Sequence, residues 1–116
     1  MIKLHQQLTR IAGLGALVLG ADFLFAPRAA LLSLHMALGG IVALMLAILA
    51  VWALIDRVRV PAAIAALIWA AATIYVGMMK GRGTAGEIIH VLLGIGAIGL
   101  AEMLAAAINR RRASLA

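Results

Sequence analysis

The sequence predicts an all-α fold: an integral membrane four-helix bundle whose helices run up, down, up and down. Three observations lead to this prediction. Of the 116 residues, 66% are hydrophobic and only 12% are charged, whereas soluble domains are about 45–50% apolar. Four apolar segments are long enough to cross a bilayer core, which takes about 20 residues of helix. Only short polar stretches separate these segments, and such short connections make neighbouring helices antiparallel.

The four predicted spans belong to a single membrane domain, residues 1–116, and cover residues 8–25, 31–55, 62–79 and 86–108. The first span also resembles a secretory signal, because Lys3 and Arg10 come before a long apolar stretch. We interpret it as the first membrane helix.

The ten basic residues are distributed unevenly along the chain. Three of them, Arg28, Lys80 and Arg82, fall in the first and third connections. The other seven lie near the termini and in the second connection: Lys3, Arg10, Arg57, Arg59, Arg110, Arg111 and Arg112. Cytoplasmic loops of membrane proteins carry an excess of Lys and Arg. We therefore expect both termini in the cytoplasm, in a bacterial inner membrane.

Several kinds of partner and site are excluded. In so apolar a chain the net charge of +6 serves membrane orientation, and we expect no nucleic acid partner. The absence of cysteine rules out disulfides, iron–sulfur clusters, zinc–thiolate sites and covalently attached c-type haem. The sequence contains no nucleophile–base arrangement, phosphate-binding loop or dinucleotide fingerprint, so we expect no catalytic site of its own.

Two stretches have matching patterns around a histidine: LHMALGGIVAL at residues 34–44 and IHVLLGIGAIG at residues 89–99. His35 lies near the start of the second predicted span and His90 near the start of the fourth. These two spans run parallel, so both histidines should lie at a similar depth, toward the outer side. In a bundle built in sequence order the two helices are diagonal neighbours, on the order of 13 Å apart. That separation suits two imidazoles that reach toward a shared metal.

Glycines accompany both histidines. Gly39 and Gly94 follow them by four residues and so lie on the same helix faces. A position without a side chain leaves room there for a flat macrocycle. Gly13 and Gly20, seven residues apart in the first predicted span, would let that helix approach the same space.

With the stretches HMALGG and HVLLGIG, the helical layout resembles the membrane cytochromes of the b type, the cytochrome b and cytochrome b561 families. The resemblance implies one haem b, with His35 and His90 as its metal ligands. It implies electron transfer as the function, alone or as a haem-bearing subunit, with a redox partner or a larger membrane complex. Basic side chains near the outer side would then accompany the haem propionates: Arg28, Lys80 and Arg82. Those families usually have two histidine pairs, but His5 stands alone near the inner side, so we expect no second haem.

Other interpretations stay open. Histidines in membrane helices also occur as structural or interfacial residues. The chain would then be a haem-free accessory or structural subunit, or a homo-oligomer, packed through GLGALVLG and GIGAIG. In size it also resembles the small multidrug resistance transporters, with Glu102 as the coupling carboxylate, although that family carries its key glutamate in the first helix. Zinc or copper fits less well, because no further ligand is placed beside both histidines.

Arg10 and Glu102 are charged residues inside the first and last predicted spans. First and last helices of a closed bundle touch, and these two residues should lie at a similar depth on the cytoplasmic side. Because an unpaired charge there is costly, we predict a structural ion pair between them. The alternative is a proton or cation site at Glu102.

Overall fold

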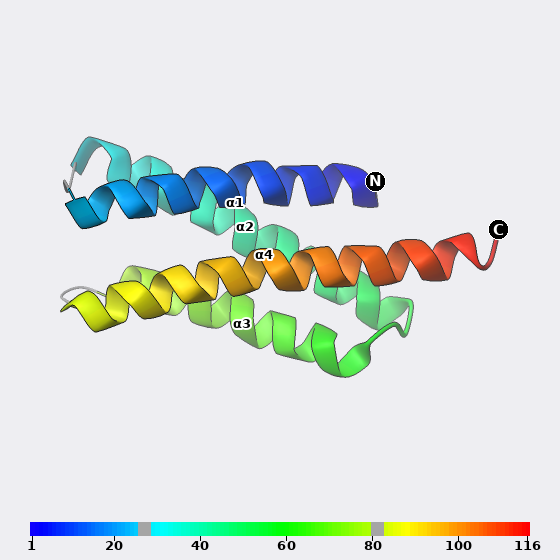
Figure 1. The fold of residues 1–116 in the computed structure, drawn as a ribbon. Coiled ribbons are helices and arrows are strands. Elements are labelled where there is room, and N and C mark those ends of the chain that lie inside the picture. Colours follow the sequence, from blue (N-terminus) through cyan, green and yellow to red (C-terminus); the bar gives the residue numbers. More distant parts are fainter. Residues whose placement is uncertain (26–28, 80–82) are drawn as a thin grey trace.

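The computed structural model describes residues 1–25, 29–79 and 83–116, and these residues form an all-helical chain. The four helices are α1 (Ile2–Phe25), α2 (Ala29–Ile55), α3 (Val60–Met78) and α4 (Gly83–Ala113). Figure 1 shows them lying lengthwise beside one another, with both termini and the α2–α3 turn at the same end of the molecule. The opposite end holds the last turn of α1, the first turns of α2 and α4, and the last turn of α3.

The helices do not sit at the corners of a square. α2 and α4 contact each other directly, and each of them also contacts α1 and α3. Within the described residues α1 and α3 have no contact with each other. The distance across the bundle is therefore shorter between α2 and α4 than between α1 and α3, and residues on α2 and α4 can face each other at close range.

Three of the helices are long and apolar enough to cross a membrane within the described residues: Ala30–Ile55, Val60–Met78 and Gly83–Ala113. The molecule is about 50 Å long, which is close to the ~40–45 Å of a bilayer with its headgroup regions. The remaining predicted span, residues 8–25, lies within α1, and its membrane crossing stays a prediction.

The turn between α2 and α3 has a defined hydrogen-bond pattern. The Val58 N–H donates to the Ala53 carbonyl at 2.7 Å, and the Arg57 N–H donates to the Leu54 carbonyl at 3.1 Å. This pair of bonds is the Schellman arrangement, whose C′ position usually holds glycine in the left-handed conformation. Here Arg57 occupies it with φ 51°, and Arg59, directly before α3, has φ 46°. A left-handed residue other than glycine costs roughly 1–2 kcal/mol, so this turn is strained at two arginines.

The packed core lies in the half of the molecule that contains the termini. Its largest fully buried aliphatic side chains come from α2 and α4: Leu46, Leu49, Leu104 and Ile108. Small residues fill the spaces between the helices: Ala50, Ala53, Ala63, Ala66, Ala97, Ala101 and Ala105. Such small residues let membrane helices approach closely, and here they bring α3 and α4 against α2.

Candidate functional site

His35 on α2 and His90 on α4 face each other at the end of the bundle away from the termini. Their ring centroids lie 5.9 Å apart, and the ring planes make an angle of 69°. Both side chains are partly buried. Because α2 and α4 are in direct contact, the two rings come together without any other helix between them.

The orientation of the His35 ring is set by α1. Its Nδ1 lies 3.0 Å from the Ala16 carbonyl oxygen. A carbonyl oxygen only accepts hydrogen bonds, so Nδ1 is the protonated nitrogen and Nε2 of the neutral ring carries the lone pair. Phe23 adds an edge-to-face contact, with ring centroids 5.5 Å apart. A hydrogen bond from the second ring nitrogen to a backbone carbonyl is typical of metal-ligating histidines.

Two glycines on the neighbouring helices make room for the histidine rings. A Cβ atom added at Gly77 on α3 would lie 2.9 Å from Cε1 of His90. A Cβ atom added at Gly20 on α1 would lie 3.3 Å from Cε1 of His35. Any larger residue at Gly77 must displace the ring of His90. Each histidine is therefore seated against a helix other than its own.

A cavity of about 280 Å³ surrounds the histidine pair and is bordered by all four helices. Its lining is mostly apolar, and the polar side chains on it are the two histidines, Thr73 and Glu87. Six of its lining residues are glycines: Gly13, Gly20, Gly39, Gly40, Gly77 and Gly94. The four glycines predicted from the sequence, Gly13, Gly20, Gly39 and Gly94, are all among them.

These glycines have different surroundings. A Cβ atom added at Gly39 or Gly40 meets nothing within 4 Å, and one at Gly94 meets only the Leu17 side chain, at 3.7 Å. A Cβ atom at Gly13 would lie 2.5 Å from the side chain of Ile98. Gly13 therefore serves the close contact between α1 and α4, whereas Gly39 and Gly40 border open space.

The histidine pair has the separation that a single shared ion requires. A metal–imidazole bond is about 2.0–2.1 Å long, which places two imidazole centres on opposite sides of one ion about 6 Å apart. The observed 5.9 Å also falls within the 4.5–7 Å range of direct edge-to-face ring contact. In the described parts of the chain no group of three or more His, Asp or Glu side chains could hold a metal. The described side chains thus offer two histidine ligands at that separation, and a metal held between them would take its other ligands from elsewhere.

The basic residues expected near the haem propionates, Arg28, Lys80 and Arg82, lie outside the described residues. Their role stays a prediction. Several cavity residues were not predicted from the sequence, among them Gly40, Thr73 and Gly77. Thr73 and Gly77 lie on α3, which carries no histidine, so the spacing rule that found Gly39 and Gly94 does not apply to them.

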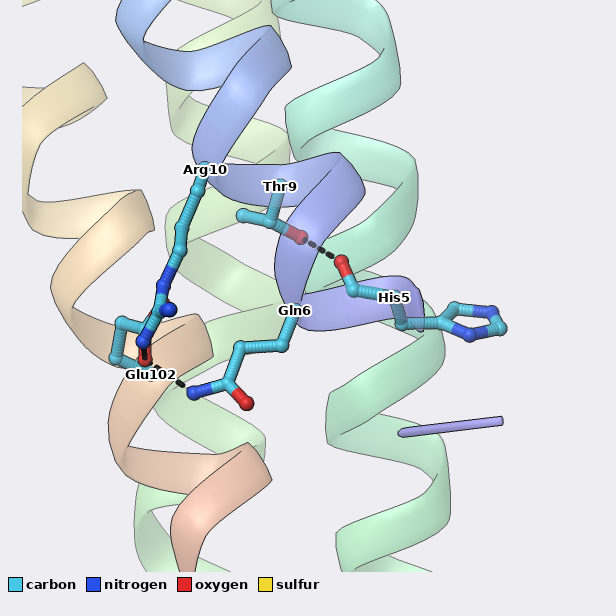
Figure 2. Close-up of polar contacts among 5 residues, drawn as sticks. All are labelled: His5, Gln6, Thr9, Arg10 and Glu102. Atoms are coloured by element: carbon cyan, nitrogen blue, oxygen red, sulfur yellow. Dashed lines mark hydrogen bonds and ion pairs between the residues drawn. The ribbon is translucent and has the colours of Figure 1, made fainter. Parts of the chain in front are cut away.

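A second polar cluster links α1 to α4 in the half that contains the termini. Figure 2 shows Arg10 and Gln6 on α1 reaching toward Glu102 on α4. Arg10 donates from Nε to Oε1 at 2.5 Å and from Nη2 to Oε2 at 2.8 Å. The Gln6 amide donates to the same carboxylate. Both carboxylate oxygens are thus engaged by α1, and the structure contains the ion pair that the sequence predicts.

His5 does not join either polar cluster. In Figure 2 its ring points to the side of α1 away from Glu102. The ring packs on Trp52 of α2, with centroids 4.8 Å apart, and Nδ1 lies 3.0 Å from the Met1 carbonyl oxygen. His5 therefore belongs to the opposite end of the bundle from the His35–His90 cavity.

Comparison with protein-family models, with curated proteins and with solved structures finds no match to this chain.

Proposed function

We propose that the protein is an integral membrane four-helix bundle with up-down-up-down topology and both termini in the cytoplasm of a bacterium. The three long apolar helices support membrane insertion. The placement of both termini at one end supports an even number of crossings (Figure 1). The seven basic residues near that end favour its cytoplasmic location.

We further propose that the protein binds one haem b between His35 and His90. The observation that carries this proposal is the 5.9 Å separation of the two rings within a glycine-lined cavity. A haem held by two histidines has no open coordination position, so it would supply one-electron transfer and no substrate chemistry. Electrons must then come from and go to a redox partner or other subunits of a larger membrane complex.

The chain's own residues have distinct roles in this proposal. The Ala16 carbonyl holds the proton on Nδ1 of His35 and would thereby leave Nε2 available as a metal ligand. Gly20 and Gly77 leave space for the two rings, and Gly39 and Gly94 leave space for a planar group beside them. The apolar lining of the cavity limits the access of water, which is one of the factors that set a haem potential.

A visible absorption spectrum of the purified full chain, expressed with haem supplied, tests the proposal. We expect a Soret band and, after reduction with dithionite, a sharp α-band at the b-type position, with about one haem per chain by pyridine haemochrome assay. A preparation that stays colourless after incubation with hemin, although it is folded by circular dichroism, contradicts haem binding.

The same geometry also supports a haem-free alternative. At 5.9 Å the two imidazole rings are close enough for direct edge-to-face contact. The histidines would then tie α2 to α4, and the protein would be an accessory subunit of a membrane complex or a homo-oligomer. The transporter alternative has less support, because Glu102 is engaged by Arg10 and Gln6.

A further inference from the structure

Positive charge is unbalanced at the end of the molecule that contains the termini. The described basic residues lie in α1, in the α2–α3 turn and in the last turn of α4. The acidic side chains near them are Asp56 and Glu102, and both form ion pairs, Asp56 with Arg112 and Glu102 with Arg10. Five exposed basic residues then remain without a carboxylate partner among the described residues: Lys3, Arg57, Arg59, Arg110 and Arg111. We call these five residues the basic collar.

Two members of the basic collar occupy strained backbone positions. Arg57 fills the C′ position of the α2 terminus, and Arg59 precedes the first residue of α3, both with positive φ. Glycine adopts this conformation without strain. Arginine at both positions of one short turn therefore opposes local folding. Strain of this kind concentrates at functional sites.

Contacts hold the turn and the end of α4 together. Nε of Arg112 lies 3.0 Å from Oδ2 of Asp56, and the Arg112 guanidinium lies 5.8 Å from the centre of the Trp52 ring. Nη1 of Arg59 lies 4.0 Å from Sδ of Met103 on α4. The collar residues of the turn are thereby placed beside those of α4.

An apolar groove lies on α2, directly before the turn that carries Arg57 and Arg59. It has a volume of about 240 Å³ and runs along the last turns of α2, where it is lined by Ala47, Ile48, Val51, Trp52 and Ile55. The groove ends next to Asp56 and Arg57 in the chain. A phosphate group at the collar and a hydrocarbon chain in the groove would match this arrangement of cationic and apolar surface.

We propose that the basic collar and the α2 groove form a binding site for an anionic phospholipid. The collar binds the phosphate of the headgroup, and the groove takes one acyl chain. Arginine suits this role, because its guanidinium donates paired hydrogen bonds to phosphate oxygens. This inference rests on the proposed membrane insertion but not on haem binding.

Tryptophan quenching by brominated lipids tests the site, since Trp52 lines the groove. The full chain is reconstituted into phosphatidylcholine vesicles that contain either brominated phosphatidylglycerol or brominated phosphatidylcholine. The variant Trp52→Phe gives the background from Trp69. We expect an association constant at least about fivefold higher for phosphatidylglycerol, because each basic residue near an anionic surface contributes about that factor.

The double variant R57G/R59G separates lipid binding from folding. Glycine relieves the left-handed strain, so the variant should unfold at an equal or higher temperature, while the lipid preference falls by about fivefold or more. R57K/R59K keeps the charge and should retain the preference. K80Q/R82Q removes the same amount of charge from the α3–α4 connection, and the preference for phosphatidylglycerol should stay unchanged. Ala47→Phe narrows the groove and should reduce quenching by both lipids.

Equal association constants for the two lipids in the wild-type chain, or an unchanged preference in R57G/R59G, overturn the proposal. Loss of the preference on addition of millimolar inorganic phosphate would assign the site to free phosphate and would also overturn it. A colourless protein that still prefers phosphatidylglycerol removes the haem proposal and supports this one. A haem-loaded protein without a preference for phosphatidylglycerol supports the haem proposal and overturns the lipid site.

Discussion

The two halves of the bundle are built from the same four helices but are packed in opposite ways. The half with the termini has a closed core of aliphatic side chains and alanines, with Leu46, Leu49, Leu104 and Ile108 fully buried. The other half contains a partly open cavity of about 280 Å³ whose lining includes six glycines and two histidines. The small residues of the closed half bring helices together, whereas several glycines of the other half keep space beside a pair of polar rings.

This difference shows how a short membrane chain can separate stability from binding. Two ion pairs tie α4 to other segments in the closed half, where Glu102 contacts Arg10 of α1 and Arg112 contacts Asp56 of the α2–α3 turn. The largest fully buried side chains, Leu46, Leu49, Leu104, Ile108 and Thr9, all lie in the closed half, and sites that bind ligands are commonly drawn from the less stable parts of a fold. Changes in the two halves should therefore have separable effects on ligand binding and on unfolding.

The largest expected effect is the loss of haem on removal of either cavity histidine. His35→Ala and His90→Ala should each abolish the reduced α-band, because each would remove one of the two proposed haem ligands. The measurement is the reduced-minus-oxidised spectrum of each purified variant, normalised to protein. His5→Ala is the matched control, since His5 packs on Trp52 in the closed half, and its spectrum should equal that of the wild type. An α-band that persists in either cavity variant would contradict the pairing.

A smaller loss is expected when a methyl group is added behind His90. Gly77→Ala places Cβ 2.9 Å from Cε1 of the ring, and overpacking of this kind costs typically about 1–3 kcal/mol. Haem affinity, measured by titration with hemin, should therefore fall roughly 5- to 150-fold. Gly99→Ala is the control, because Gly99 is exposed and an added Cβ there meets nothing within 4 Å. Equal haem affinities for the two variants would mean that Gly77 does not seat the ring.

In the closed half, the Arg10–Glu102 pair should affect unfolding and leave the haem spectrum unchanged. The two side chains are 47% and 30% exposed, so we expect the small coupling free energy of a surface ion pair rather than the larger value of a fully buried pair. Thermal unfolding of Arg10→Gln, Glu102→Gln and the double variant in detergent gives the coupling. If the effects of the two single variants on the free energy of unfolding add up to the effect of the double variant, the ion pair contributes no coupling energy. A changed α-band in any of these variants would show that the two halves do not act separately.

Much of the helical layout could be predicted from hydropathy, but the helix ends could not. α1 begins at Ile2 rather than at residue 8, and α4 continues to Ala113 rather than to residue 108. The added turns carry polar residues such as Lys3, Gln6 and Arg111. A hydropathy pattern detects the apolar part of a helix, whereas backbone hydrogen bonding continues past the point where the side chains become polar.

The Arg10–Glu102 contact could be predicted, because an unpaired charge inside an apolar membrane helix is costly and these two opposite charges lie at a similar depth. The matching depth of His35 and His90 could also be derived from helix order. Their actual distance could not, since a square bundle keeps α2 and α4 apart and the structure brings them into contact. The position of Gly77 against His90 depends on how α3 packs on α4, and spacing along one helix carries no information about that.

The smallest predicted effect is a change in the free energy of unfolding that depends on whether haem is bound. Gly39→Ala adds a methyl group at a cavity position where a Cβ meets nothing within 4 Å. In the haem-free protein it should raise the free energy of unfolding by up to about 1 kcal/mol, because alanine favours helix over glycine. With haem bound, the same methyl group competes with the macrocycle for space, so the gain should shrink or reverse. Thermal unfolding with and without hemin measures both values, and Gly99→Ala, outside the cavity, should give the same gain in each state. A gain at Gly39 that hemin does not alter would show that no ligand fills the space beside His35, and the histidine half would then differ from the closed half in packing alone.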